Sequence, residues 1–290
     1  MFEHEYADVN NICLHYITVG SGELIMFLHG FPEFWYEWKN QLAEFGKDYQ
    51  AVAPDMRGYN LSSKPAEVEQ YEMKYLVEDI RALAKQLGHK KFVLVAHDWG
   101  GGVAWPFAMR HPDYLKKLII INAPHPLTFM RELRDNPAQR KASQYILVQR
   151  APEAEELLAH NNYAVLVDSL LGNGLRQGYF TEEDRKAYIE AWSQPGALTG
   201  GLNYYRAAHL GPFIGESDEL LSAEPSMFMV KVPTLVIWGE KDRYLLSGNL
   251  EGLEDYVSDL TVKRIPDGSH WVIHEKPDLI NTYIRGFIED

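Results

Sequence analysis

The chain has 290 residues, with 41 acidic and 28 basic side chains and a formal net charge of −13. An acid-rich surface repels nucleic acid and anionic lipid, and no apolar run is long enough to cross a bilayer, so neither nucleic acid nor a membrane is an expected partner. The single cysteine, Cys13, excludes an internal disulfide, and the N-terminus lacks the basic and apolar regions of a signal peptide, so we expect a cytoplasmic protein.

The first part of the chain alternates short apolar runs with segments of helical spacing. Strands are predicted at 11–19, 24–28, 50–53, 92–96 and 117–122. Helices are predicted at 35–45, at 71–87, and after the strand at 92–96 through to Arg110. Strands that alternate with helices indicate an α/β protein whose mostly parallel sheet is covered by helices on both faces.

The pattern changes after Asn122, because no segment from 124 to 229 has the character of a buried strand. Helices are predicted there at 151–163, 181–192 and 202–209. Strand character returns at 233–238 and 261–265, with helices predicted at 250–257 and from Pro277 onward. We therefore expect a core formed by 1–123 and 230–290 and a helical cap at 124–229. The cap should lie over the carboxyl edge of the sheet, where open α/β folds bind their ligands.

Residues 92–102, FVLVAHDWGGG, end a buried strand at an acid flanked by small residues. A strand, a tight turn that glycine permits, and a following helix have the geometry of the nucleophile turn in the α/β-hydrolase fold. Asp98 occupies the position where a serine is usual. The segment therefore predicts an α/β-hydrolase fold with Asp98 as the nucleophile.

Asp242 and His270 each follow a predicted strand, in the acid-before-histidine order of this fold. His270 would take a proton from water, and Asp242 would hold the other ring nitrogen. Each residue alone would more often be structural, but the shared order and strand context favour a catalytic set. His111, His125 and His274 lack that context, and neither a metal site nor a cofactor is expected.

A carboxylate nucleophile determines which kind of carbon atom is the expected target. Its attack on an alkyl carbon gives an ester, whereas attack on an acyl carbon gives only a labile anhydride, so the expected target is an sp³ carbon that carries a leaving group. Water that attacks the ester carbonyl creates an oxyanion. The backbone N–H groups of Phe31, in the turn at 29–32, and of Trp99 are the expected donors for it.

Tyrosines of the predicted cap are candidate acids for an epoxide, because a phenol can donate a hydrogen bond to the ring oxygen and protonate the alkoxide that forms. Taken alone, each tyrosine would more often be a packing residue. The cap tyrosines are Tyr145, Tyr163, Tyr179, Tyr188, Tyr204 and Tyr205.

The chain contains HDWGG around Asp98, HGFPE at 29–33 and PDMRGY at 54–59, and Asp242 and His270 follow later strands. These motifs and the placement of the acid and the histidine resemble the epoxide hydrolases of the α/β-hydrolase superfamily, particularly small bacterial ones. The resemblance covers nearly the whole chain. In that family one ring-opening tyrosine ends a Pro-x-Gln-x-x-x-Ser-x-Tyr stretch and the other lies in a Leu-x-x-Tyr-Arg segment. The resemblance thus implies Tyr145 and Tyr205 as the pair that acts on the epoxide oxygen. It implies conversion of an epoxide to a vicinal diol through an ester on Asp98, without a cofactor. Asn60 departs from the glycine that is usual in the family, although asparagine also adopts the left-handed conformation.

Two alternatives remain open. A haloalkane or haloacid dehalogenase would use the same Asp98 nucleophile, and the Trp99 indole would suit a halide. Haloalkane dehalogenases usually have asparagine where Phe31 stands, and the haloacid enzymes have arginines beside the nucleophile, so both departures favour an epoxide. A non-enzymatic small-molecule receptor on the same scaffold is less expected, because this chain keeps every member of the catalytic set.

A small apolar epoxide and water are the expected partners. Apolar pocket walls are expected from Trp35, Phe129 and Met130, together with Phe31 and Trp99. The sequence is compatible with a homodimer but contains no feature that specifies one.

Overall fold

The computed structural model describes residues 2–208, 211 and 224–290. Its centre is an eight-stranded sheet in the order β1-β2-β4-β3-β5-β6-β7-β8. The β1–β2 and β2–β4 pairs are antiparallel and the other pairs are parallel. The strands are β1 Glu3–Val9, β2 Ile12–Val19, β3 Leu24–Leu28, β4 Gln50–Pro54, β5 Phe92–His97, β6 Leu115–Ile121, β7 Thr234–Gly239 and β8 Leu260–Ile265.

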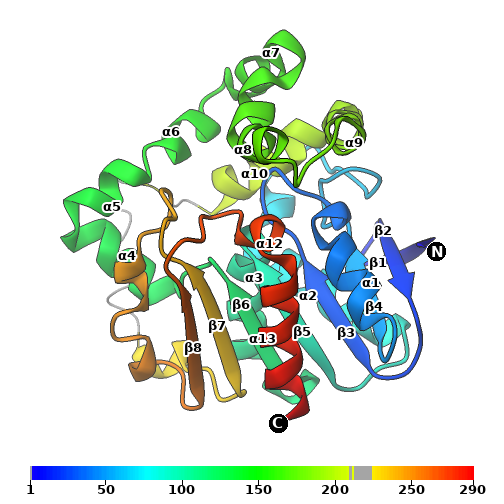
Figure 1. Cartoon of the computed structure of the whole chain (residues 1–290), viewed down its shortest axis with the longest axis vertical. Helices are drawn as coiled ribbons and strands as arrows, with labels where there is room; N and C mark the ends of the chain where they lie inside the picture. The colour runs from blue at the N-terminus through cyan, green and yellow to red at the C-terminus, as the bar shows by residue number, and fades with distance from the viewer. Residues whose placement is uncertain (1, 209–210, 212–223) are drawn as a thin grey trace.

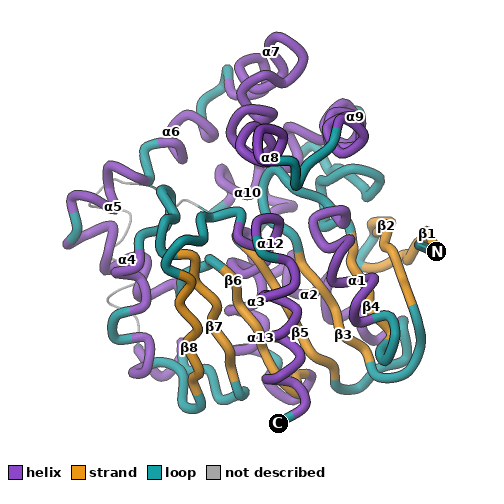
Figure 2. Tube along the Cα trace, viewed as in Figure 1, coloured by secondary structure: helices purple, strands orange, loops and turns teal. Residues whose placement is uncertain are grey.

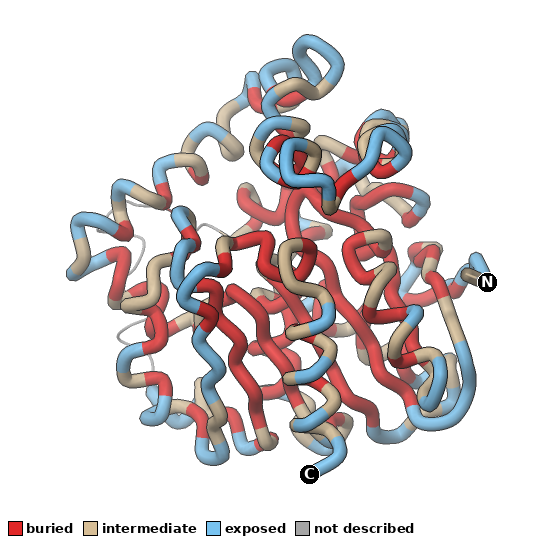
Figure 3. Tube along the Cα trace, in the orientation of Figure 1, coloured by how far each residue is buried: buried red, intermediate tan, exposed pale blue. Residues whose placement is uncertain are grey.

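Helices cover both faces of the sheet, with α1 and α13 on one face and α2 and α3 on the other (Figure 1). Strands β3, β5 and β7 are buried along their whole length, so the core of the molecule lies at the centre of the sheet (Figure 3). This is why they are continuous apolar runs rather than alternating ones. The covering helices are α1 Lys39–Phe45, α2 Met73–Gln86, α3 Trp99–Arg110, α12 Val272–Glu275 and α13 Pro277–Glu289.

An inserted helical region lies between β6 and β7 and extends above one edge of the sheet (Figure 2). The predicted α/β-hydrolase fold with a mostly parallel sheet and a helical insertion is confirmed. None of the described helices has the length and apolar character needed to span a bilayer. The helices of the insertion are α4 Pro126–Asp135, α5 Pro137–Ala142, α6 Tyr145–Arg150, α7 Ala154–Leu166, α8 Gly172–Gln177, α9 Glu182–Ser193 and α10 Ala197–Ala207.

Several element predictions were wrong or incomplete. The segment at 250–257 is not an α-helix: 3₁₀ turns at Ser247–Leu250 and Leu253–Asp255 flank Gly252, whose φ of 69° interrupts a helix. Strand β1 was missed because it is an edge strand whose first four residues are exposed, which removes the apolar alternation. The three helices α4, α5 and α6 were also missed. The predicted helix at 202–209 begins earlier, at Ala197, and its end at His209 lies outside the described residues.

Candidate active site

Asp98 lies in a strained turn between β5 and α3, with φ 48° and ψ −121°. The turn leaves no room for side chains at the neighbouring glycines. A Cβ on Gly30 would lie 2.4 Å from Asp98 Cβ, and one on Gly100 would lie 2.2 Å from the Leu28 carbonyl oxygen. Strain of this kind concentrates where a side chain has to be held at one point, and here it presents the carboxylate at the end of a buried strand.

The two oxygens of Asp98 have different neighbours. Oδ1 accepts a hydrogen bond from the Phe31 backbone N–H at 2.8 Å, and Oδ2 lies 3.5 Å from His270 Nε2. Burial raises the pKa of Asp98, but the hydrogen bond and charge of His270 outweigh burial and lower it below the ordinary value. The carboxylate is therefore ionised at neutral pH, and among the described residues only Oδ1 accepts a backbone N–H.

His270 and Asp242 form a short pair, with 2.6 Å between Nδ1 and the carboxylate oxygen. Burial alone would lower the pKa of His270, but the charges and hydrogen bonds of Asp242 and then Asp98 raise it well above the ordinary value. The other oxygen of Asp242 accepts the backbone N–H groups of Tyr244 and Leu245 at 2.8 and 2.9 Å. These bonds fix the acid, and the acid fixes the orientation of the imidazole.

Asn122, which follows β6, completes this arrangement. Its Nδ2 donates to Asp242 at 2.8 Å and its Oδ1 accepts the Gly239 backbone N–H at 2.8 Å. Asn122 has a positive φ of 40° and is fully buried. Sequence analysis missed it, although an asparagine that ends a buried strand beside a catalytic edge was a usable signal.

Tyr145 from α6 and Tyr205 from α10 line the same cavity as Asp98. Their rings lie edge to face with centroids 6.3 Å apart, and the Trp99 ring lies 4.9 Å from that of Tyr205. Burial, and after it the charge of Asp98, raises the pKa of both phenols well above 10. Both phenols are therefore protonated at neutral pH.

The cavity has a volume of about 740 Å³. Phe129 and Met130 line it, as the sequence suggested. Trp35 does not: its ring packs against Phe2 and His4 at 5.4 and 5.7 Å, because the turn that carries it leads toward β1. The cavity follows one face of α3, where Gly102, Pro106, Met109 and Arg110 line it from the nucleophile end to the far end.

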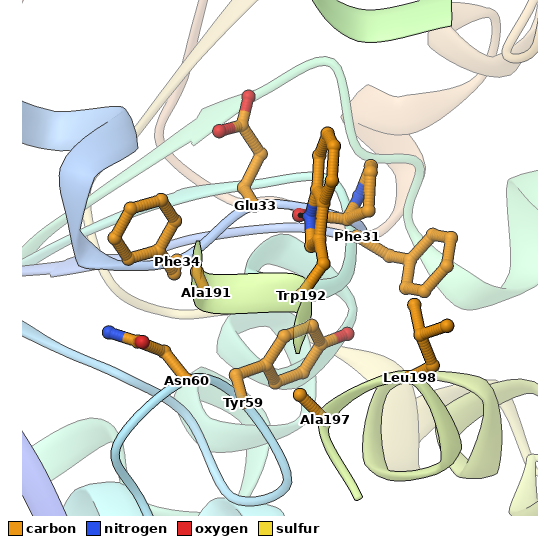
Figure 4. A pocket seen from close by; sticks show the side chains of 10 residues that line it. Phe31, Glu33, Phe34, Tyr59, Asn60, Ala191, Trp192, Ala197 and Leu198 are labelled. Carbon is orange, nitrogen blue, oxygen red and sulfur yellow. Dashed lines mark hydrogen bonds between the residues drawn. The ribbon is translucent and has the colours of Figure 1, made fainter. Parts of the chain in front are cut away.

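The turn that holds Phe31 is packed against the insertion. The Trp192 indole N–H of α9 donates to the Pro32 carbonyl at 2.6 Å, and the Phe31 ring lies 5.5 Å from that of Tyr205. In Figure 4, Phe31 and Trp192 lie beside Leu198, with the Glu33 carboxylate directed away from that small pocket. The insertion therefore holds the backbone donor as well as supplying the phenols.

The three histidines that the sequence analysis set apart from His270 have other partners. His111 contacts Glu78 at 3.0 Å, and the His125 ring accepts the Leu127 N–H at the start of α4. His274 contacts Glu33 at 2.7 Å. Within the described residues, Glu33, Glu37 and His274 are the group whose ligand atoms lie close enough for a metal ion. Glu37 already accepts a hydrogen bond from the Gly30 N–H, and Glu33 accepts one from the Tyr188 O–H. Both partners are hydrogen-bond donors, so neither would compete with the carboxylates as a metal ligand.

Comparison with known proteins identifies the fold family and several relatives. The sequence profile of the α/β-hydrolase fold family matches residues 23–277. The chain is 40% identical to the Bacillus subtilis AB hydrolase superfamily protein YfhM, over 99% of this chain and 98% of that one. It is 34% identical to epoxide hydrolase 2 of Caenorhabditis elegans, over 100% of this chain and 81% of the relative. It also resembles the crystal structure of a mutant epoxide hydrolase from Bacillus megaterium in complex with its product, (R)-3-[1]naphthyloxy-propane-1,2-diol. That match has a TM-score of 0.92 and 41% identity, and covers 99% of this chain and 100% of the other.

Proposed function

The chain belongs to the α/β-hydrolase fold family and is an epoxide hydrolase, and from this premise we propose that Asp98 opens the epoxide ring as a covalent nucleophile. The observation that carries this proposal is one shared cavity wall: the ionised Asp98 and two protonated phenols, Tyr145 and Tyr205, line the same space.

In the first step, Asp98 Oδ2 attacks an epoxide carbon and the C–O bond of the ring breaks. Tyr145 and Tyr205 hydrogen-bond to the ring oxygen, and one of them transfers its proton to the alkoxide as the alkoxide forms. Two phenols suit this oxygen, because it gains negative charge and needs both a donor and a proton. The product of this step is a hydroxyalkyl ester on Asp98.

In the second step, water attacks the carbonyl carbon of the ester. The water has to lie within hydrogen-bond reach of His270 Nε2, which is now 3.5 Å from Asp98 Oδ2, the oxygen that becomes the alkyl oxygen of the ester. His270 takes a proton from the water, and the resulting oxyanion forms on Oδ1, which already accepts the Phe31 N–H. We assign the second donor to the Trp99 N–H. The intermediate collapses as the bond between the carbonyl carbon and the alkyl oxygen breaks, and that oxygen takes the remaining proton of the attacking water. The diol leaves with Asp98 ionised again, and the proton on His270 returns to the phenolate through solvent.

Esterification also changes the base. Once Asp98 is alkylated, its negative charge is gone, and with it one of the causes that raise the pKa of His270. His270 then loses its proton more readily, so the base becomes competent when the ester that it must hydrolyse has formed. Asp242 keeps its charge throughout and stabilises the imidazolium during the second step.

The cavity supports an apolar epoxide with a long or bulky substituent as the substrate. Its volume lies in the upper part of the range for small-molecule sites, and its walls are mostly apolar. The face of α3 between Trp99 and Arg110 gives it a length of about 16 Å, at 1.5 Å per residue.

We assign residues 124–229 as a cap over a core of 1–123 and 230–290. We also propose a cytoplasmic site of action, in keeping with the free thiol of Cys13.

Single-turnover hydrolysis in ¹⁸O-labelled water tests the covalent step. Label should enter the Asp98 carboxylate first and reach the diol only in later turnovers. Label in the diol of the first turnover would refute the ester. Terminal epoxides of increasing chain length and the matched alkyl halides, assayed together for diol and halide, test the substrate class. Faster halide release than diol formation would favour a dehalogenase.

A further inference from the structure

A second group of buried titratable side chains surrounds the nucleophile turn: Glu33, Glu37, His97 and His274. Glu37 lies in the 3₁₀ turn Trp35–Trp38, and His97 is the residue before Asp98. The mechanism above assigns none of these side chains a role. Their hydrogen-bond geometry nevertheless determines where one proton has to be.

The proton count starts at His97. Its Nε2 lies 3.0 Å from the His270 backbone carbonyl, which can only accept, so Nε2 carries a hydrogen. In the neutral imidazole, Nδ1 is then an acceptor. Nδ1 lies 2.5 Å from Glu37 Oε1, and neither atom has a well-aligned hydrogen-bond partner among the described residues. Two acceptors cannot share so short a contact, so a proton lies between them.

The surrounding charges place this proton on Glu37. Burial, and after it the charge of Glu33, raises the pKa of Glu37 well above its ordinary value. Burial, and after it the charge of His270, whose ring centroid is 4.7 Å away, lowers the pKa of His97 to about 4. A neutral acid that donates to a neutral imidazole is thus favoured over an ion pair.

Glu37 also contacts the turn that supplies the oxyanion donor. Its Oε2 accepts the Gly30 backbone N–H at 3.1 Å, and Gly30 immediately precedes Phe31. One carboxyl group therefore connects the oxyanion turn through Gly30 with the backbone of the catalytic histidine through His97. Glu37 itself is not among the residues that line the substrate cavity.

We propose that Glu37 is a positioning residue that acts as a neutral carboxylic acid. Its O–H donates to His97 and its carbonyl oxygen accepts from Gly30, so that one buried proton holds the oxyanion turn and His270 in register with Asp98. This inference rests on the proposed function for its catalytic consequence, whereas the protonation state is a property of the protein alone.

Glu37→Gln tests the neutral state, because an amide reproduces it: Nε2–H donates to His97 and Oε1 accepts from Gly30. We expect Tm to match that of the parent and the rates of both half-reactions to stay within about threefold of the parental rates. The matched control is Glu33→Gln. Glu33 accepts the Tyr188 O–H and lies 2.7 Å from His274 Nε2, so an amide there would direct N–H toward a donor. We expect this control to lower Tm and activity. Loss of activity in Glu37→Gln equal to that in Glu33→Gln would overturn the proposal.

Glu37→Leu tests the positioning role, because it removes both hydrogen bonds and leaves two buried partners unpaired. Ester hydrolysis should slow by about 10- to 100-fold, and alkylation by less, since His270 acts only in hydrolysis. An adduct on the Asp98 peptide should therefore accumulate, which general destabilisation would not produce. Parental rates in this variant would refute the role. Should the variant not fold, the glutamine pair and the spectra below still decide the question.

Infrared difference spectra and the pH dependence of Tm read the proton directly. The parent should show the C=O stretch of a protonated carboxyl group at neutral pH, and Glu37→Gln should lack it. Because the folded pKa of Glu37 is raised, its contribution to stability is complete below the unfolded pKa and is lost as pH rises through the folded pKa. His97, Glu33, Asp98 and His270 are present in both proteins, so the difference between the two proteins isolates Glu37. No band difference would contradict the neutral acid. A parent that forms no ester would refute the proposed function instead.

Discussion

The charge of Asp98 should control the proton affinity of His270, and Asp98→Asn tests this directly. The amide keeps the shape of the side chain and the acceptor for the Phe31 N–H but removes the negative charge. That charge lies 3.5 Å from His270 Nε2, and the two side chains are 12% and 5% exposed, so bulk solvent screens it little. At an effective dielectric constant of about 20, the interaction amounts to about 5 kcal/mol, on the order of a thousandfold in proton affinity.

The measurement is an NMR titration of the His270 imidazole in the parent and in Asp98→Asn. His270 should titrate at a clearly lower pH in the variant. Tyr145→Phe is the matched control, since it removes a hydroxyl from the same cavity without changing any charge near the nucleophile. Titration of His270 at the same or a higher pH in Asp98→Asn would refute the reasoning. The hydrolysis step would then need another source for its base.

Three further predictions concern other parts of the site. Tyr145→Phe and Tyr205→Phe should each slow alkylation by about 100-fold, and the double variant should nearly abolish it, as measured by burst kinetics with an epoxide; unchanged alkylation would assign the proton to another group. Asn122→Leu removes a hydrogen bond to the Asp242 carboxylate, worth about 1.5–3 kcal/mol. Ester hydrolysis in single-turnover assays should therefore slow at least tenfold. Equal slowing of alkylation would instead indicate general damage to the fold. Gly30→Ala should lower Tm sharply, because its Cβ would lie 2.4 Å from that of Asp98. Gly286→Ala, with nothing within 4 Å in α13, should raise stability by about 0.5–1 kcal/mol, and similar Tm changes in the two variants would contradict this packing.

The core could be predicted from the sequence because its strands are buried on both faces and read as continuous apolar runs. β5 and β7 are examples, and the residues that follow them, Asp98 and Asp242, could be placed at one edge from strand ends alone. Local patterns failed where exposure removed the apolar signal, as in β1, or where a glycine with positive φ divided an apparent helix, as at Gly252.

The positioning residues could not be predicted, since their roles depend on contacts between distant segments. Asn122 meets Asp242 across 120 positions of sequence, and Glu37 meets His97 across 60. No local period records such a contact. Trp35 illustrates the opposite error: it is an aromatic residue close in sequence to the oxyanion turn, but the chain direction after that turn takes its ring to the β1 side of the sheet.

The placement of Tyr145 has a physical cause that the motif alone does not explain. Gln139, six positions earlier, is fully buried and uses all four hydrogen-bonding positions of its amide. Its partners are Ser143 Oγ and the Tyr244 carbonyl as acceptors, and the Leu246 N–H and Asn249 Nδ2 as donors. Three of these four partners lie in the loop that follows Asp242. The same side chain therefore connects the segment that carries Tyr145, the proposed ring-opening phenol, with the segment that carries Asp242, the proposed catalytic acid. A glutamine is required there because only an amide offers two donors and two acceptors at once, whereas glutamate would bring an unpaired charge into the interior.

Because the Tyr244 and Leu245 N–H groups also hold Asp242, a shift of the loop that follows Asp242 would move Asp242 and Tyr145 together. The insertion is thus connected to the core through Gln139, between Tyr145, which is proposed for ring opening, and Asp242, which is proposed for ester hydrolysis.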